Sequence, residues 1–156
     1  MPNFTANLTR LTARDVDRGP DHPAVVATFI AGLADPERRA DSETLIALMQ
    51  AATGAEPHLE GSGVAFGRYH FRYASGREGD ASPVGFAPTP RVMTVYLLSG
   101  MVGYDDLLAG LGRFRRGKVC LYIRRLADID IEILEALIRR CVAHLEQVET
   151  ELGTNR

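Results

Sequence analysis

The chain has 156 residues, of which 46% are hydrophobic and 24% are charged, and its formal net charge is −2. This length and composition are those of one globular domain, and they exclude a largely disordered chain. A net charge so close to zero creates no global field for nucleic acid or for an acidic membrane surface, so neither is expected as a partner, and an anion would have to bind a local cluster of charge.

The cysteines and the first residues indicate a location. Two cysteines are too few for a disulfide scaffold. The N-terminal sequence lacks the basic region followed by an apolar run that is typical of a secretory signal. No stretch is long and apolar enough for a membrane-spanning helix. We therefore expect a cytoplasmic protein.

The first half of the chain predicts two helices after an irregular start. Residues 1–20 show neither a helical nor a strand period, so we expect a loose N-terminal arm, followed by a single domain over residues 21–152. A helix over about 21–33 has Pro23 in its first turn. A second helix over about 35–54 has Asp35 as its N-cap and Gly54 as its stop.

From residue 61 to residue 123 the hydrophobic period changes to two. The pattern predicts strands at about 64–73, 83–87, 91–98 and 119–124, with turn formers over 74–80 and a short helix over 104–111. A final helix follows, with Asp128 or Asp130 as its N-cap and with Cys141 on its apolar stripe. The order α-α-β-β-β-α-β-α predicts an α+β fold, in which helices pack on one face of an antiparallel sheet of about four strands.

The segment 63–73, GVAFGRYHFRY, alternates aromatic and basic side chains. Because successive residues of a strand point to opposite faces, the aromatic and basic residues occupy different faces. They are Tyr69, Phe71 and Tyr73 on one face and Arg68, His70 and Arg72 on the other. A bulge at Gly67 would reset this alternation for the residues before it. The simplest interpretation is a half-buried strand whose aromatic residues pack under the helices.

A functional interpretation of the same segment requires two other strands. If the strands over 91–98 and 119–124 turn their polar residues the same way, one sheet face carries His70, Arg72, Tyr96, Tyr122 and Arg124. Guanidinium groups and phenols suit a carboxylate or a phosphate, and a histidine could accept a proton. The same side chains could equally form the interface of a homodimer.

A second basic cluster follows the short helix. Residues 113–125 contain six basic residues and no acid, namely Arg113, Arg115, Arg116, Lys118, Arg124 and Arg125. The segment 112–118 has the spacing G-x-x-x-x-G-K of a phosphate loop, but Val119 offers no hydroxyl to Mg²⁺, and the expected helix precedes the loop instead of following it. We therefore expect either a solvated rim or a docking site for an anionic ligand or an acidic partner.

Metal and nucleophile signals are weaker. The four histidines stand alone and no Cys-x-x-Cys occurs, which argues against a metal centre. Asp35, Glu37 and Asp41 could line an acidic ridge that holds iron, although a solvated helix start explains them as well. Cys120 would be activated if the charge of Lys118 lies close to it, and is otherwise a small buried residue.

Several motifs resemble the YdhG-like bacterial domain of unknown function. They are the segments 35–41 (DPERRAD), 66–73 (FGRYHFRY), 76–80 (GREGD), 117–123 (GKVCLYI) and 126–130 (LADID). The resemblance extends over about residues 25–142 and implies a small α+β domain reminiscent of frataxin, for which some relatives carry an iron-chaperone label. It implies no catalytic residues. This chain departs from the pattern in having no Trp and in having Val119 where the family often has Ser.

Together these observations predict a non-enzymatic domain that binds a small anionic ligand or an acidic protein partner, and that forms a homodimer. The expected ligand-binding residues are His70, Arg72, Tyr96, Lys118, Tyr122 and Arg124. No cofactor is expected. One alternative is a frataxin-like iron chaperone that uses the acidic ridge, and another is an uncharacterised enzyme.

Overall fold

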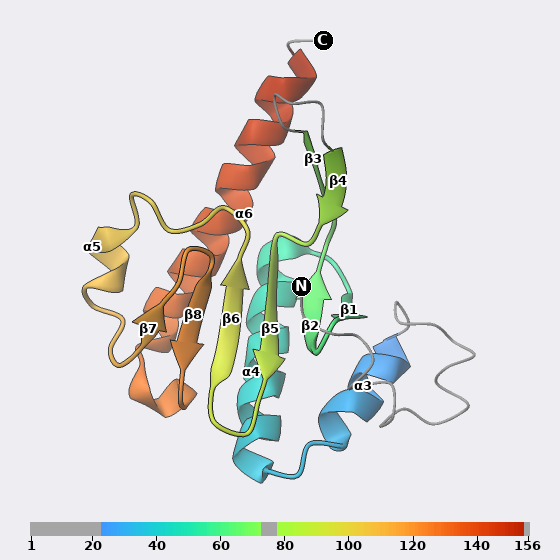
Figure 1. Cartoon of the computed structure of the whole chain (residues 1–156), viewed down its shortest axis with the longest axis vertical. Coiled ribbons are helices and arrows are strands. Elements are labelled where there is room, and N and C mark those ends of the chain that lie inside the picture. Colours follow the sequence, from blue (N-terminus) through green and yellow to red (C-terminus); the bar gives the residue numbers. More distant parts are fainter. Residues whose placement is uncertain (1–22, 73–77, 155–156) are drawn as a thin grey trace.

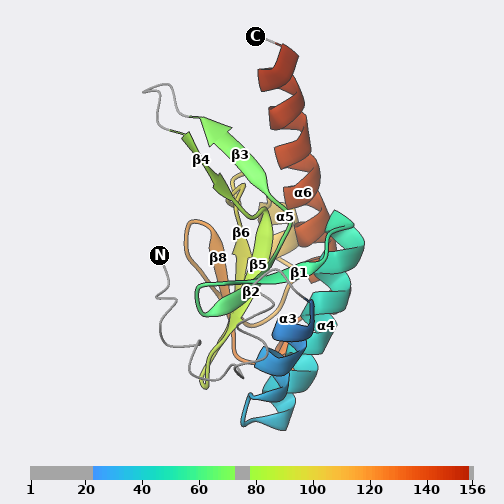
Figure 2. The same ribbon diagram turned by 90° about the vertical axis from the view of Figure 1, so that its right-hand side faces the viewer.

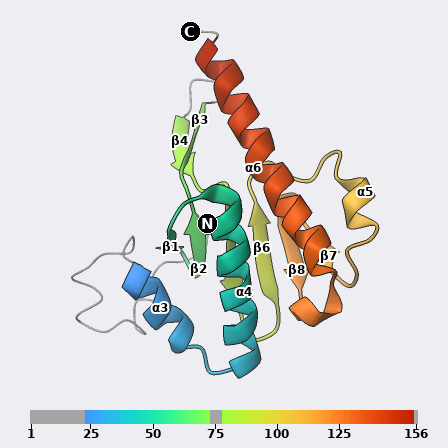
Figure 3. The ribbon, with the colours of Figure 1, turned by 180° about the vertical axis from the view of Figure 1, so that it is seen from behind.

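The computed structural model describes residues 23–72 and 78–154 of the chain, so the predicted arm over residues 1–20 lies outside the described residues. It shows the predicted α+β class, with a six-stranded antiparallel sheet and helices (Figure 1). Two helices, α4 (Pro36–Thr53) and α6 (Ile131–Thr154), run along one face of this sheet (Figures 2 and 3). The opposite face of the sheet is not covered by a helix of the described chain.

The ends of α4 and α6 are set by the residues that the sequence indicates. The Asp35 side chain accepts a hydrogen bond from the Glu37 amide at 2.9 Å, and Gly54 ends α4 in a left-handed conformation with φ of 69°. Asp130, rather than Asp128, caps α6, because its carboxylate accepts from the amides of Glu132 and Ile133 at 3.0 and 3.3 Å. The other helices are α3 (Pro23–Ala31), the short α5 (Asp105–Leu108) and the 3-10 helix η1 (Leu126–Asp128).

The main sheet has the order β1-β2-β5-β6-β8-β7 and is antiparallel throughout. Its strands are β1 (Pro57–Glu60), β2 (Gly63–Phe66), β5 (Val84–Pro88), β6 (Met93–Leu97), β7 (Arg115–Arg116) and β8 (Cys120–Ile123). The estimate of about four strands was too low, because the edge strands are short: β1 has four residues and β7 has two, both of them arginine. Both exist because a neighbouring strand pairs with them.

The prediction of one strand over 64–73 is wrong. The chain turns at Gly67, which has φ of 77°, and the next residues form β3 (Tyr69–Arg72) outside the main sheet. A side chain would make that backbone conformation strained, so Gly67 suits the turn. β3 pairs with β4 (Glu78–Ala81) in a separate two-stranded sheet, whereas residues 74–80 were expected to form a turn.

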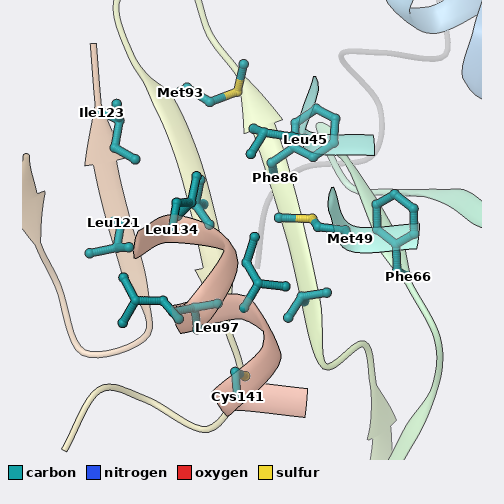
Figure 4. Close-up of a cluster of buried hydrophobic side chains, with 14 of the residues drawn as sticks. Leu45, Met49, Phe66, Phe86, Met93, Leu97, Leu121, Ile123, Leu134 and Cys141 are labelled. Atoms are coloured by element: carbon teal, nitrogen blue, oxygen red, sulfur yellow. The ribbon is translucent and has the colours of Figure 1, made fainter. Parts of the chain in front are cut away.

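The core lies between the main sheet and the two long helices (Figure 4). Alternate residues of β5, β6 and β8 point into it, as do the apolar stripes of α4 and α6. Representative members are Leu45, Met49, Phe66, Phe86, Met93, Leu97, Leu121, Ile123, Leu134 and Cys141. The predicted apolar stripe of the last helix is therefore confirmed from Leu134 to Leu145, Cys141 included, whereas Ile131 at the start of the helix is exposed.

The pairing of β2 with β5 depends on a close approach of two backbones. The β1–β2 pair is strongly turned relative to β5 and β6 (Figure 2). A Cβ on Gly63 would lie 2.2 Å from the carbonyl oxygen of Phe86, which is far inside van der Waals contact. Only glycine therefore fits at this position of β2.

Two buried charged residues of α4 form hydrogen bonds with the chain segments that directly follow β5 and β8. Arg38 is only 5% exposed, and it donates from Nε to the Thr89 carbonyl at 2.8 Å and from Nη1 to the Arg124 carbonyl at 2.6 Å. Asp41 accepts from Nε of Arg125 at 3.0 Å and from the Leu126 amide at 3.2 Å. Each buried charge is thus satisfied by hydrogen bonds to residues that follow β5 or β8.

Candidate functional site

The face of the sheet turned away from α4 and α6 carries the predicted tyrosines. In β6, Met93, Val95 and Leu97 are buried on the helix side, so Thr94 and Tyr96 point the other way. The register places Thr94 opposite Tyr122 and Tyr96 opposite Cys120. The structure therefore brings Tyr96 and Tyr122 onto one face, as the functional interpretation of the sequence required.

The strand β7 adds a guanidinium group to this face. Arg115 is the register partner of Tyr122, and its guanidinium carbon lies 5.4 Å from the centre of the Tyr122 ring. This is the range of a cation–π contact, which holds the arginine over the phenol. The loop from β7 to β8 is tight, since the Gly117 amide donates to the Cys120 carbonyl at 2.8 Å.

The six basic residues of the segment 113–125 fall into two groups. Arg116 forms an exposed ion pair with Asp105 at 3.3 Å, and Arg125 pairs with Asp41 and Glu37. The other four are exposed and form no ion pair with an acidic side chain of the described chain. These four, Arg113, Arg115, Lys118 and Arg124, are called the basic edge below, because they lie in or beside β7 and β8 at one edge of the sheet.

The structure separates His70 and Arg72 from the other predicted ligand-binding residues. Both belong to β3, which is paired only with β4, so they do not extend the face that carries Tyr96 and Tyr122. The turn at Gly67 is the reason, because it takes the chain out of the main sheet before His70 is reached. The side chains of these two residues lie outside the described part of the structure.

The segment 112–118, which has phosphate-loop spacing, contains β7 and connects α5 to the strands at this edge of the sheet. It follows α5 and leads into β7 and β8, the order expected from the sequence and the reverse of a phosphate loop. The Arg113 amide donates to the Asp128 carbonyl at 3.1 Å, and the Gly117 amide is bonded within the hairpin. Two amides of the segment are therefore already committed to the protein's own backbone.

The carboxylates of the acidic ridge are engaged in contacts with their own helix and with Arg125. Asp35 caps α4, while Glu37 and Asp41 both pair with Arg125. Asp41 is also buried, at 7% exposure. Among the residues that the structure describes, no three His, Cys, Asp or Glu side chains gather closely enough to hold a metal ion.

Cys120 is not an activated thiol. Its partial burial raises the pKa of the thiol, and this effect outweighs a hydrogen bond with Tyr122 that acts in the opposite direction. A raised pKa leaves less thiolate at neutral pH, so the reactivity considered for a cysteine close to Lys118 is not supported.

Sequence reasoning missed a polar cluster at the other end of the open face. His58 and Glu60 alternate along β1 and therefore share one face of it, and Ser82 lies just before β5. The Ser82 hydroxyl oxygen lies 3.1 Å from Nε2 of His58 and donates to Oε2 of Glu60 at 2.7 Å. The pair His58 and Glu60 is visible in the sequence as His-x-Glu, but Ser82 joins it only through folding.

The cluster lines a cavity of about 150 Å³, together with Arg68 and Ala81. The hydrogen bond with His58 is the largest cause that lowers the pKa of Glu60, with the hydroxyl of Ser82 and the charges of His58 and Arg68 acting in the same direction against burial. Glu60 is thus held in its ionised form. A larger cavity, of about 510 Å³, lies between α3, α4 and β1 and is mainly apolar.

Two further findings complete the description of this chain. No helix of the described residues has the length and apolarity needed to cross a membrane. Comparisons with models of protein families, with curated proteins and with solved structures gave no match to this chain.

Proposed function

We propose that this domain binds anionic ligands, bearing phosphate or carboxylate groups, at the basic edge. One observation carries the proposal: four exposed cations lie in or beside β7 and β8 without an acidic partner in the described chain, while the neighbouring Arg116 and Arg125 are neutralised. Guanidinium groups along this edge offer bidentate hydrogen bonds to planar or tetrahedral oxyanions, and Lys118 adds a point charge.

The surface next to these cations suits a bound ligand rather than a bare solvated rim. The ring of Tyr122 packs against the guanidinium group of Arg115 and so restricts the motion of this group before a ligand binds. Tyr96 and Thr94 continue the same face in the next strand. Phenol and hydroxyl groups can donate further hydrogen bonds to an oxyanion.

We infer binding rather than catalysis as the activity of this surface. The four cations lie at an exposed edge, whereas the cavities of about 510 and 150 Å³ are lined by other residues. Catalysis generally requires that water be excluded from the reacting groups. An open edge favours a ligand or the acidic surface of a partner protein over a substrate that must be enclosed.

The test is a titration of the full chain with inorganic pyrophosphate and with citrate, followed by calorimetry. The double variant Arg115→Gln, Lys118→Gln should lose at least about tenfold in affinity, which is about 1.4 kcal/mol. Its matched control is Arg139→Gln, which removes an exposed arginine of α6 that pairs with Glu135 at 3.1 Å. The control should change the affinity less than about twofold, because exposed ion pairs are weak and Arg139 belongs to α6, which covers the other face of the sheet (Figure 3).

Two results would contradict the proposal. One is the absence of binding by either anion together with the absence of an acidic protein partner in pull-down experiments. The other is an equal loss of affinity in Arg139→Gln, which would show that the anions respond only to net charge.

Three further predictions accompany this function. We infer a relationship to the YdhG-like domains, supported by the run of motifs given above and by the α+β fold that the resemblance implies. A homodimer would use the open face of the sheet, and native mass spectrometry would detect it together with any retained anion. A cytoplasmic location agrees with two cysteines that are both free thiols.

A further inference from the structure

We propose that His58, Glu60 and Ser82 form a binding site for a first-row divalent cation such as Zn²⁺ or Mn²⁺. The site is separate from the basic edge, and it is also separate from the acidic ridge of α4. Three polar atoms from two segments converge there on one small cavity: Nε2 of His58, Oε2 of Glu60 and the hydroxyl oxygen of Ser82.

The distances between these atoms bracket those of neighbouring ligands on one ion. Two ligand atoms that each lie about 2.1 Å from a cation are about 3.0 Å apart at a right angle and about 3.4 Å apart at the tetrahedral angle. The three separations in the structure are 2.7 Å from Glu60 to Ser82, 3.1 Å from His58 to Ser82 and 3.6 Å from His58 to Glu60. A cation can therefore sit above this triangle of atoms with little movement of the side chains.

The backbone holds the three side chains in place before any ion binds. His58 and Glu60 are two residues apart in β1, which is paired with β2 along its whole length. Ser82 is 6% exposed and precedes β5, which pairs with β2 on its other side. Such preorganisation reduces the conformational entropy that binding would otherwise cost.

The donor types select the kind of ion. Imidazole suits zinc, copper, iron and nickel, whereas carboxylate and hydroxyl oxygens suit magnesium, calcium and manganese. A mixed set of one nitrogen and two oxygens favours Zn²⁺ and Mn²⁺ over Mg²⁺ and Ca²⁺. The cavity of about 150 Å³ leaves room for water or an anion at the remaining coordination positions.

Arg68 opposes a bare cation at this site. It lines the same cavity and is close enough to Glu60 to act on that carboxylate electrostatically. Its positive charge should weaken the attraction for the cation and favour an anion as a further ligand. The variant Arg68→Gln should accordingly bind the cation more tightly, an effect opposite in sign to the loss of a ligand.

The same three residue types could instead suggest a serine nucleophile, but the geometry speaks against it. In such a triad the carboxylate orients the histidine from the ring nitrogen that does not face the serine. Here Glu60 approaches Nε2, the nitrogen that also faces Ser82, and Glu60 itself accepts the hydrogen bond of the serine hydroxyl. The arrangement places three potential metal ligands around one point and does not form a proton relay.

Calorimetric titrations of the full chain with ZnCl₂ and with MnCl₂ test the proposal. We expect one ion per chain, with at least about tenfold weaker binding in Glu60→Gln and in His58→Gln, and tighter binding in Arg68→Gln. The matched control is His144→Gln, an exposed histidine of α6 far along the chain, which should leave the affinity unchanged. Unchanged binding in both ligand variants would overturn the proposal, as would the lack of any binding below about 1 mM, a free energy of about 4.1 kcal/mol.

A second measurement needs no variant and so remains decisive if a substitution impairs folding. Paramagnetic Mn²⁺, added at a small fraction of the protein concentration, broadens NMR signals close to its binding site. The amide signals of His58, Glu60 and Ser82 should broaden first. Broadening centred on Asp35 and Asp41, or spread over the acidic surface, would refute the assignment.

Discussion

Arg38 shows how a single charged side chain becomes part of a protein interior. Its guanidinium group reaches the Thr89 and Arg124 carbonyls, which belong to two different connections of the sheet. The planar fork of arginine presents its donors in a fixed geometry, which suits two acceptors at once. The residue therefore ties α4 to the ends of β5 and β8, and its burial is a consequence of this position.

Replacing Arg38 should destabilise the protein strongly. In Arg38→Ala both carbonyls lose a charged donor in a buried place, so we expect a loss of about 2–4 kcal/mol in the free energy of unfolding. Arg38→Lys should recover less than half of this loss, because a compact ammonium group cannot reach both acceptors. Urea denaturation of the two variants measures the difference.

The control for this experiment is Arg139→Ala, which removes an arginine that is exposed on α6 and makes one ion pair within its own helix. It should change the free energy of unfolding by less than about 0.5 kcal/mol. Equal effects of the Arg38 and Arg139 substitutions would show that the two carbonyl contacts of Arg38 do not stabilise the fold.

At the scale of elements, a bidentate ion pair joins the short helix α5 to α6. Arg140 donates from both terminal nitrogens to Asp106, at 3.0 and 3.2 Å, and its guanidinium carbon lies 5.4 Å from the centre of the Tyr104 ring. The hydrogen bond from Arg140 is the largest cause that lowers the pKa of Asp106 below its ordinary value of 3.8. The contact should therefore weaken in acid.

The sign of this pH effect follows from the direction of the shift. Because the pKa of Asp106 is lower in the folded protein, its stabilising contribution is fully present above about pH 5. The contribution is lost as the pH falls below 3.8 and through the lower folded value. The difference in free energy of unfolding between the protein and Asp106→Asn should thus be constant from pH 7 to 5 and should vanish on further acidification.

Chemical denaturation over the range pH 7 to 2.5 provides the measurement. Asp105→Asn is the neighbouring control, since Asp105 makes a single exposed contact with Arg116. We expect this control to change the free energy of unfolding at pH 7 by less than Asp106→Asn does, because one exposed hydrogen bond replaces a bidentate pair. A difference for Asp106→Asn that grows in acid would contradict the assignment.

At the scale of the whole molecule, the two sheets should differ in local stability. The strands β5, β6 and β8 lie in the middle of the main sheet and carry the core, whereas β3 and β4 pair only with each other. A two-stranded hairpin is marginal in water without further support. In Figures 1 and 2 this hairpin projects from the end of the main sheet nearest the C-terminus.

Hydrogen exchange measures this difference amide by amide. The bonded amides of β3 and β4 should exchange at least roughly 100-fold faster than those of β6, whose opening requires loss of the core. The amides of β2, which is also connected to β3 but belongs to the main sheet, provide the comparison within the same chain. Equal protection in β3 and β6 would mean that the hairpin unfolds together with the core.

The sequence by itself determined the class of the fold and most of its helices. Asp35, Gly54 and the stripe that contains Cys141 could be interpreted correctly because caps and helical periodicity depend on residues within a few positions of each other. The alternation in the predicted strand over 91–98 likewise allowed Tyr96 to be placed on a polar face. Local patterns of this kind do not depend on which strands pair with one another in the sheet.

Only the tertiary structure decided which of these elements meet. The turn at Gly67 removed His70 from the proposed face, and Arg125 neutralised Asp41 from 84 positions away in the chain. Ser82 joins His58 across 24 positions. Such contacts follow from strand pairing and packing, which select partners far apart in sequence, and a period of two cannot indicate them.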